Sequence, residues 1–356
     1  MTSPLWRATM VAAIVAAMAG CGRPHAASRE PAASHPQPSQ VTASTVFAFT
    51  SPSQLSIVHG GAIVASVPTS GEPTHPVFTD SARFAAAATS DGHIVTTGLA
   101  PGSSRTITAD TQQVFAGHGD TISWWRQPNQ LMSLDLSQPS AEPVSTTIDV
   151  PGDNTDNTRL LSLAHGVAVF ARPGLPSGGE ELIRMDRDRT FHTPTPSPEI
   201  TTPIQLTAPS SDGRNFAYLG MIRAACPKDG VNIVDTDTGA VSSPSMPYTL
   251  FDKAATHRIW WDTDQLLHMS MTTRPCTTDA STETMTSWKL EQEKWIHAEP
   301  TDALVSRQLG HNLVAVVTAT QFNPPRGTLT LQTSTDRTHI ADDVTDLAAP
   351  AVPDAQ

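Results

Sequence analysis

Positive charge is scarce in this 356-residue chain. It has 22 Lys and Arg residues against 34 Asp and Glu residues, which gives a net charge of −12. A nucleic-acid-binding protein needs a stripe of basic side chains to neutralise phosphates, so this composition argues against a nucleic-acid partner. Only 4 of the basic residues are Lys, a bias that is typical of GC-rich genomes such as those of actinobacteria.

Sequence signatures of catalysis and cofactor binding are missing as well. The chain has no G-x-S-x-G elbow, no H-E-x-x-H, no Walker loop and no G-x-G-x-x-G after a strand. Its 13 His residues are scattered, and no two of them have metal-ligand spacing. We therefore expect no cofactor, no metal site and no catalytic residue.

The N-terminus lacks an apolar run long enough to span a membrane, which takes ~20 residues. Its run, Thr9–Gly20, has 12 residues, and Arg7 is the only charge before Cys21. A basic start, a short apolar middle and small residues at the end are typical of a secretory signal peptide. A buried helix is the alternative.

The residues Met18-Ala19-Gly20-Cys21 resemble the bacterial lipobox, usually written Leu-Ala-Gly-Cys. The resemblance implies a diacylglyceryl group on the Cys21 thiol and cleavage before it, so residues 1–20 would be a lipoprotein signal peptide. Two acyl chains anchor a protein stably, and we expect the protein at the extracytoplasmic face of the cell membrane. Residues 21–44, rich in Pro, Ala and Ser, are expected to be a disordered tether.

Cysteine is rare too, because only Cys226 and Cys276 remain after Cys21. An even pair in an exported chain predicts a disulfide, and two separate buried thiols are the alternative. A zinc site is disfavoured because neither cysteine lies in a Cys-x-x-Cys motif. The bridge would close a loop of about 50 residues and stabilise the fold by up to ~4 kcal/mol in the chain-entropy model.

Short Val-, Ile-, Thr- and Phe-rich runs, cut by Gly and Pro, follow the tether and predict many short strands. Two patterns recur: D-x-x-x-F-A at Asp80 and Asp212, 132 residues apart, and Trp124-Trp125 and Trp260-Trp261, 136 residues apart. Both offsets equal three units of about 44 residues, and a period of ~40–45 residues with four strands indicates propeller blades.

The period divides the chain into a β-propeller at 45–350 and a C-terminal tail at 351–356. The expected fold is all-β, with seven four-stranded blades. Six blades would need 51 residues each, and eight blades are the alternative. The predicted units are 45–70, 71–109, 110–152, 153–200, 201–248, 249–300 and 301–350.

The fifth unit shows the blade pattern best. It predicts a strand at Asn215–Ile222, a hairpin turn at Lys228-Asp229-Gly230, a strand at Val231–Asp235 and a turn at Thr236–Gly239. The sequence SSDGRNFAYLG…VNIVDTDTGAV is similar to the WD40-like repeat of the TolB propeller family. The resemblance implies a ring of four-stranded sheets around a channel, with Cys226 and Cys276 in matching loops of neighbouring blades.

Five groups of residues are candidates for chemistry or binding, each with a structural reading that we favour. His118 and Asp120 suit a base and its orienter, or a turn. Asp153, Asn154, Asp156 and Asn157 suit calcium, or a turn. The segment Asp235–Gly239 resembles a calcium loop but fits the hairpin of the repeat. The doubled Trp residues suit blade packing, or stacking on a sugar, and residues 193–203 suit a linker, a glycosylated loop or a partner site.

These observations favour a lipid-anchored binding or scaffolding module at the cell envelope, whose partner is an envelope protein or a glycan. The first alternative is a propeller hydrolase or lactonase-like enzyme, in which Asp153, Asp156, His118 or Asp262 would converge in the channel. The second is a solute-binding or sensor lipoprotein. Fold does not decide between them.

Overall fold

The computed structural model describes part of the chain, from residue 46 to residue 350. The described residues are 46–152, 155–174, 179–194, 204, 206–222, 226, 228–249, 251–276, 283–310 and 312–350. The expectations for Cys21, the signal peptide, the tether, Asp153, Asn154 and residues 195–203 lie outside these ranges. Within them, no helix is long and apolar enough to cross a membrane.

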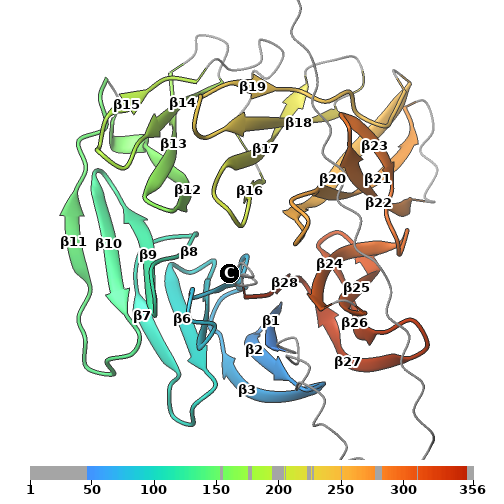
Figure 1. The fold of residues 1–356 in the computed structure, drawn as a ribbon, viewed down its shortest axis with the longest axis horizontal. Coiled ribbons are helices and arrows are strands. Elements are labelled where there is room, and N and C mark those ends of the chain that lie inside the picture. Colours follow the sequence, from blue (N-terminus) through green and yellow to red (C-terminus); the bar gives the residue numbers. More distant parts are fainter. Residues whose placement is uncertain are drawn as a thin grey trace, which may run out of the picture. The chain divides into compact units, whose positions relative to one another are not determined.

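The described strands form seven four-stranded antiparallel sheets arranged as blades around a channel, which confirms the predicted fold (Figure 1). Helix is confined to one short 3₁₀ turn, η1 (Thr155–Asn157), within the described ranges.

The strands of each blade run from the channel outward. Blade 1 holds β28 (Asp346–Ala348), β1 (Val46–Ser51), β2 (Gln54–His59) and β3 (Ala62–Pro68); blade 2, β4 (Val77–Phe78), β5 (Phe84–Ala88), β6 (His93–Gly98) and β7 (Arg105–Thr108); blade 3, β8 (Phe115–Ala116), β9 (Thr121–Arg126), β10 (Gln130–Asp135) and β11 (Val144–Thr147). Blade 4 holds β12 (Arg159–Ala164), β13 (Val167–Pro173), β14 (Glu180–Met185) and β15 (Phe191–His192); blade 5, β16 (Thr207–Pro209), β17 (Asn215–Ile222), β18 (Lys228–Asp235) and β19 (Val241–Ser242). Blade 6 holds β20 (Asp252–Trp261), β21 (Leu267–Pro275), β22 (Thr284–Glu291) and β23 (Lys294–His297); blade 7, β24 (Ala303–Gly310), β25 (Leu313–Phe322), β26 (Pro325–Gln332) and β27 (Arg337–Val344).

The ring closes through its last strand. β28 pairs with β1, so the inner strand of blade 1 comes from the C-terminal end of the chain and its other three strands come from the N-terminal end. The predicted unit 301–350 therefore contributes its last strand to the first blade. Sharing one blade between both ends ties them together and gives β1 a paired strand on each side.

Alternation along the strands fills the seams between blades. Trp124 and Trp125 are adjacent in β9 and are almost fully buried, yet they belong to different clusters of apolar side chains. Trp124 packs in the seam with blade 2 and Trp125 in the seam with blade 4, because successive side chains of a strand point to opposite faces. Blade packing is therefore the role of this Trp pair.

One of the two repeat patterns does not mark equivalent strands in the two blades that it relates. Phe84 and Phe216 both lie in second strands, β5 and β17, so the D-x-x-x-F-A spacing marks equivalent positions. Trp124 lies in the second strand of blade 3, but Trp260 lies in β20, the first strand of blade 6. The Trp offset is therefore not a true blade repeat, because any strand with two buried faces accommodates paired Trp residues.

The predicted turn at Lys228-Asp229-Gly230 is wrong. All three residues lie inside β18, where Asp229 pairs with Met221 and Gly230 with Gly220. The long register of β17 with β18 continues past the Asp-Gly pair and overrides its local turn preference. The predicted strand Asn215–Ile222 is β17 as expected.

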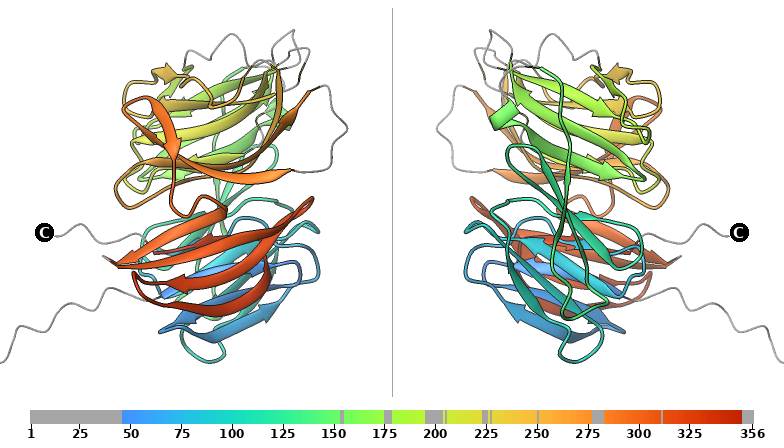
Figure 2. Two further views of the ribbon diagram at one scale, coloured as in Figure 1. Left: turned by 90° about the vertical axis from the view of Figure 1, so that its right-hand side faces the viewer. Right: turned by 90° about the vertical axis from the view of Figure 1, so that its left-hand side faces the viewer.

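The antiparallel order gives the ring two faces, shown edge-on in Figure 2. One face carries the loops between second and third strands and the connections between blades, and we call it the upper face. The lower face carries the remaining turns. Val46, where the described chain begins, pairs with His59 beside the Gly60–Gly61 turn and so lies at the lower face.

Candidate functional site

A buried ionic cluster occupies the channel. Asp346, at the start of β28, is 5% exposed, and its Oδ2 contacts Nδ1 of His75, which precedes β4. The same oxygen lies 3.4 Å from Nε of Arg258 in β20. Oδ1 accepts a hydrogen bond of 2.8 Å from the Leu347 amide. Residues from blades 1, 2 and 6, which are far apart in sequence, thus meet at one carboxylate.

A β-bulge presents Arg258 to the channel. The register of β20 against β21 shifts between Thr256 and Arg258, which leaves His257 as the extra residue. A bulge bends its strand and redirects the side chains beside it. Arg258 then donates from Nη1 to the His257 carbonyl at 2.7 Å and from Nη2 to the Thr345 carbonyl at 2.8 Å. It therefore binds the segment that closes the ring.

The cluster keeps Asp346 ionised. Burial alone would raise the pKa of Asp346, but His75, Arg258 and Arg307 outweigh it and hold that pKa well below its usual range. Burial also lowers the pKa of His257, as does the neighbouring Arg258, so His257 favours its neutral form. Its Nε2 forms a hydrogen bond of 3.0 Å with Thr272.

Loops of blades 5 and 6 are covalently joined at the upper face. A disulfide joins Cys226, in the loop between β17 and β18, to Cys276, in the matching loop after β21, with Cα atoms 6.1 Å apart. The Cys276 amide donates to the Phe251 carbonyl at 2.8 Å. Buried Lys228 donates from Nζ to the Thr249 carbonyl at 2.6 Å. These bonds fix the connection that precedes β20.

Phe251 projects from that fixed connection and is 80% exposed. Asp252 holds the other side, because its Oδ2 accepts from both the amide and the hydroxyl of Thr249 at 2.8 Å. An exposed aromatic side chain on a fixed backbone loses little conformational freedom when it is buried by a partner. Phe251 is therefore a candidate contact residue.

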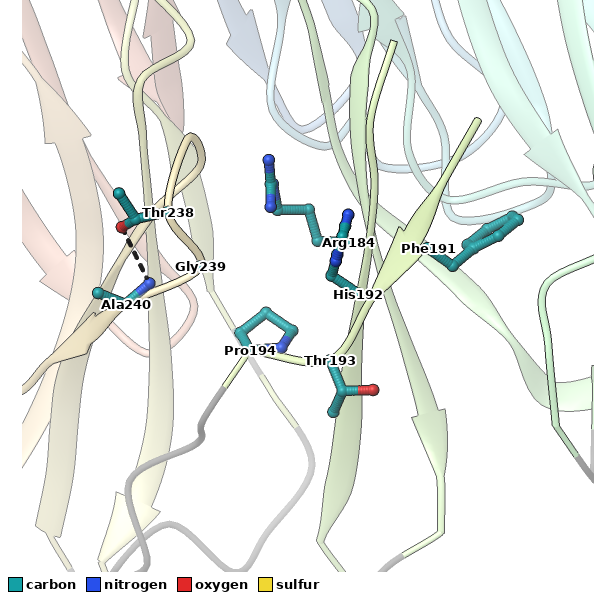
Figure 3. A pocket seen from close by; sticks show the side chains of 8 residues that line it. All are labelled: Arg184, Phe191, His192, Thr193, Pro194, Thr238, Gly239 and Ala240. Carbon is teal, nitrogen blue, oxygen red and sulfur yellow. Dashed lines mark hydrogen bonds between the residues drawn. The ribbon is translucent and has the colours of Figure 1, made fainter. Parts of the chain in front are cut away.

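An open cavity of about 540 Å³ lies at the outer rim between blades 4 and 5 (Figure 3). Arg184 lies in it beside His192, and both contact Asp186. Because that carboxylate already pairs with both groups, the cavity offers little uncompensated charge. Its lining is Arg184, Phe191, His192, Thr193, Pro194, Thr238, Gly239 and Ala240.

The residues proposed for catalysis have separate partners. His118 is fully exposed and lies 3.8 Å from Asp80, whereas buried Asp120 accepts from Ser81 and from Nε of Arg83 at 3.1 Å. His118 and Asp120 therefore do not form a base and its orienter. The Thr121 amide donates to the His118 carbonyl at 3.3 Å, which agrees with the favoured reading of this segment as a turn. Asp156 is exposed in η1.

The carboxylates of Asp262 and Asp235 both accept hydrogen bonds from backbone amides in the turns that follow them. Asp262 accepts from Nε2 of His268 at 2.9 Å and from the Leu266 amide at 2.8 Å. Burial raises the pKa of Asp262, but these bonds lower it by more. Oδ1 of Asp235 accepts from the amides of Asp237 and Thr238 at 2.9 and 2.8 Å, as the hairpin reading predicts. Among the described residues, no group of three or more His, Cys, Asp or Glu side chains could hold a metal.

The sequence did not indicate the channel cluster. His75 and Asp346 are 271 residues apart, and neither lies in a motif. Ring closure alone brings them together, so only a correct assignment of the last strand to the first blade would have found them.

Comparisons with known proteins support the fold alone. The Cps50 (Swd1) β-propeller domain of Myceliophteria thermophila matches with a TM-score of 0.54 and 12% identity, over 83% of this chain and 98% of that one. The structure of "putative TolB" from Agrobacterium tumefaciens matches with a TM-score of 0.42 and 11% identity, over 84% of this chain and 89% of that one. No protein-family model and no curated protein sequence matches the chain.

We predict that Asp346→Asn lowers the free energy of unfolding by about 3 kcal/mol at pH 7, because it leaves Arg258 buried without its counter-charge. A carboxyl group whose pKa is lowered in the folded state stabilises the fold above its unfolded pKa. The difference between wild type and variant should therefore shrink as the pH falls below ~4. Denaturant unfolding between pH 3 and 8 measures both effects.

Exposed Asp302→Asn is the matched control and should change stability by less than about 0.5 kcal/mol. Equal stability of wild type and Asp346→Asn at pH 7 would contradict the role given to the cluster.

Proposed function

We propose that the protein is a lipid-anchored β-propeller that binds a partner at the extracytoplasmic face of the cell membrane. The observation that carries this proposal is the presentation of Phe251 by a connection that the disulfide, Lys228 and Asp252 hold in place. Preorganised aromatic side chains are the usual energetic centres of protein–protein interfaces. An envelope protein is therefore the partner that the upper face, with its exposed Phe251 side chain, fits best.

The position of the chain ends supports this arrangement. The described chain enters the ring at the lower face, opposite the Cys226–Cys276 loops. A tether that leaves from the lower face lets the upper face point away from the membrane. A disulfide is also stable in the oxidising space outside the cytoplasm, where the Met18–Cys21 motif would deliver the protein.

We predict that Cys21→Ala releases the protein from the membrane fraction and leaves its N-terminus uncleaved, because the thiol is the expected site of lipid attachment. Fractionation and mass spectrometry of the N-terminus measure these effects. Cys226→Ser, which leaves the motif intact, should stay in the membrane fraction. If the Cys21→Ala chain carries no lipid and still stays entirely in the membrane fraction, the lipid anchor would be contradicted but the binding role would not.

A photocrosslinking residue at position 251 should capture one discrete partner in cells, whereas the same residue at Val144 should not. Val144 is a suitable control because it is an apolar residue, 66% exposed, on the outermost strand of blade 3. The partner should also be crosslinked to wild-type protein by a non-specific reagent. Equal capture at both positions, or none at position 251, would refute the assignment of the upper face.

A further inference from the structure

The outermost strand of blade 4, β15, lies beside two open cavities at the rim of the ring. The larger cavity, of about 540 Å³, faces blade 5, and a second cavity of about 240 Å³ reaches Pro151 and Gly152 in the connection from blade 3. Phe191, His192 and Thr193 line both cavities, so the two adjoin along β15. We call the two cavities together the rim groove.

Both guanidinium groups that line the rim groove already have a carboxylate partner. Nη2 of Arg184 contacts Oδ1 of Asp186, and Arg172 donates from Nε and Nη2 to Oε2 of Glu181 at 3.1 and 2.6 Å. The side chains of Arg184 and Arg172 are only 9% and 13% exposed, so both pairs are fixed parts of the walls. Because a neighbouring carboxylate compensates each positive charge, the rim groove favours a neutral ligand over a charged one.

His192 and Thr238 present hydrogen-bonding groups to the larger cavity. Nε2 of His192 lies 3.0 Å from Oδ2 of Asp186, and this side chain is 49% exposed. A neutral imidazole that donates from Nε2 to the carboxylate keeps Nδ1 as an acceptor. Oγ1 of Thr238 accepts from the Ala240 amide at 3.3 Å, which leaves its hydroxyl hydrogen for a ligand (Figure 3). The cavity therefore suits a ligand whose groups both donate and accept hydrogen bonds.

Phe191 adds an apolar surface on the other side of β15. Figure 3 shows its ring and the His192 ring on opposite sides of the strand, as expected for successive residues. Phe191 packs against the apolar cluster between blades 3 and 4 and is only partly buried, so the ring is held in place and still lines the groove. A fixed aromatic ring beside a few polar groups is typical of small-ligand sites.

Arg184 also holds the two walls of the larger cavity together. It lies in β14 of blade 4, and its Nη2 donates to the carbonyl of Asp237 in blade 5 at 3.2 Å. Thr238 is the next residue, so this hydrogen bond fixes Thr238 across the cavity from His192. A preformed site loses less conformational freedom when its ligand binds.

We propose that the rim groove binds a neutral oligosaccharide, with one sugar ring against Phe191 and the hydroxyl groups of the next sugar bonded to His192 and Thr238. Neutral sugars combine apolar C–H faces with hydroxyl groups that both donate and accept, and they carry no charge. The larger cavity lies within the range of about 300–1,000 Å³ that small-ligand sites occupy. This site is separate from the Phe251 surface and does not depend on it.

A glycan array tests the proposal with the purified full-length protein. The array carries neutral oligosaccharides of glucose, mannose, galactose and arabinose beside sialylated and sulfated glycans. We expect saturable binding of at least one neutral oligosaccharide, and titration calorimetry with that glycan gives its Kd. His192→Ala should weaken binding roughly three- to tenfold, which is the loss expected for one hydrogen bond. Phe191→Leu keeps an apolar side chain in the seam but removes the ring, and it should also weaken binding.

His339→Ala is the matched control and should bind like wild type. His339 also lies in an outermost strand, β27 of blade 7, where it is 58% exposed and its Nε2 lies 3.1 Å from Oδ1 of Asp342. Binding of charged glycans alone, or of no glycan on the array, would overturn the proposal. Unchanged affinity in both His192→Ala and Phe191→Leu would also overturn it, because the glycan would then bind elsewhere on the protein.

Discussion

The pairing of β28 with β1 is the interaction on which the rest of the ring depends. Three residue pairs, Ala48 with Ala348, Phe49 with Leu347 and Thr50 with Asp346, join the two ends of the described chain. Leu347 packs in the cluster shared with blade 7, and Ala348 packs in the cluster shared with blade 2. One short strand therefore seals two seams at once.

Asp346 extends this closure across the channel. Its contacts with His75 and Arg258 tie the closing strand to blades 2 and 6, and Arg258 also binds the Thr345 carbonyl. A carboxylate at this depth stabilises the fold only because these partners compensate its burial.

The groups that hold the ring closed and the groups that are exposed to a partner lie in different parts of the molecule. Groups in the channel and seams hold the blades together, so they are constrained by packing. The connections of the upper face are fixed locally, by the disulfide and by Lys228 and Asp252, and Phe251 is free to contact a partner. Loops on a rigid scaffold are where binding residues concentrate.

Local patterns in the sequence predicted much of the fold. The spacing of Phe84 and Phe216, together with the spacing of the Trp pairs, predicted the period, and the period predicted seven blades. The Trp pairs misled because buried seams select large side chains in any strand, and Asp229-Gly230 misled because strand pairing outweighed turn propensity. The channel cluster was invisible because it depends on a contact across 271 residues.

Native-state hydrogen exchange of the C-terminal strand tests the closed ring most directly. If β28 seals the ring, its amides should exchange as slowly as those of β5 and β17, because they open only when the ring opens. Complete exchange of residues 345–348 at the earliest labelling time, with β5 and β17 still protected, would contradict the account.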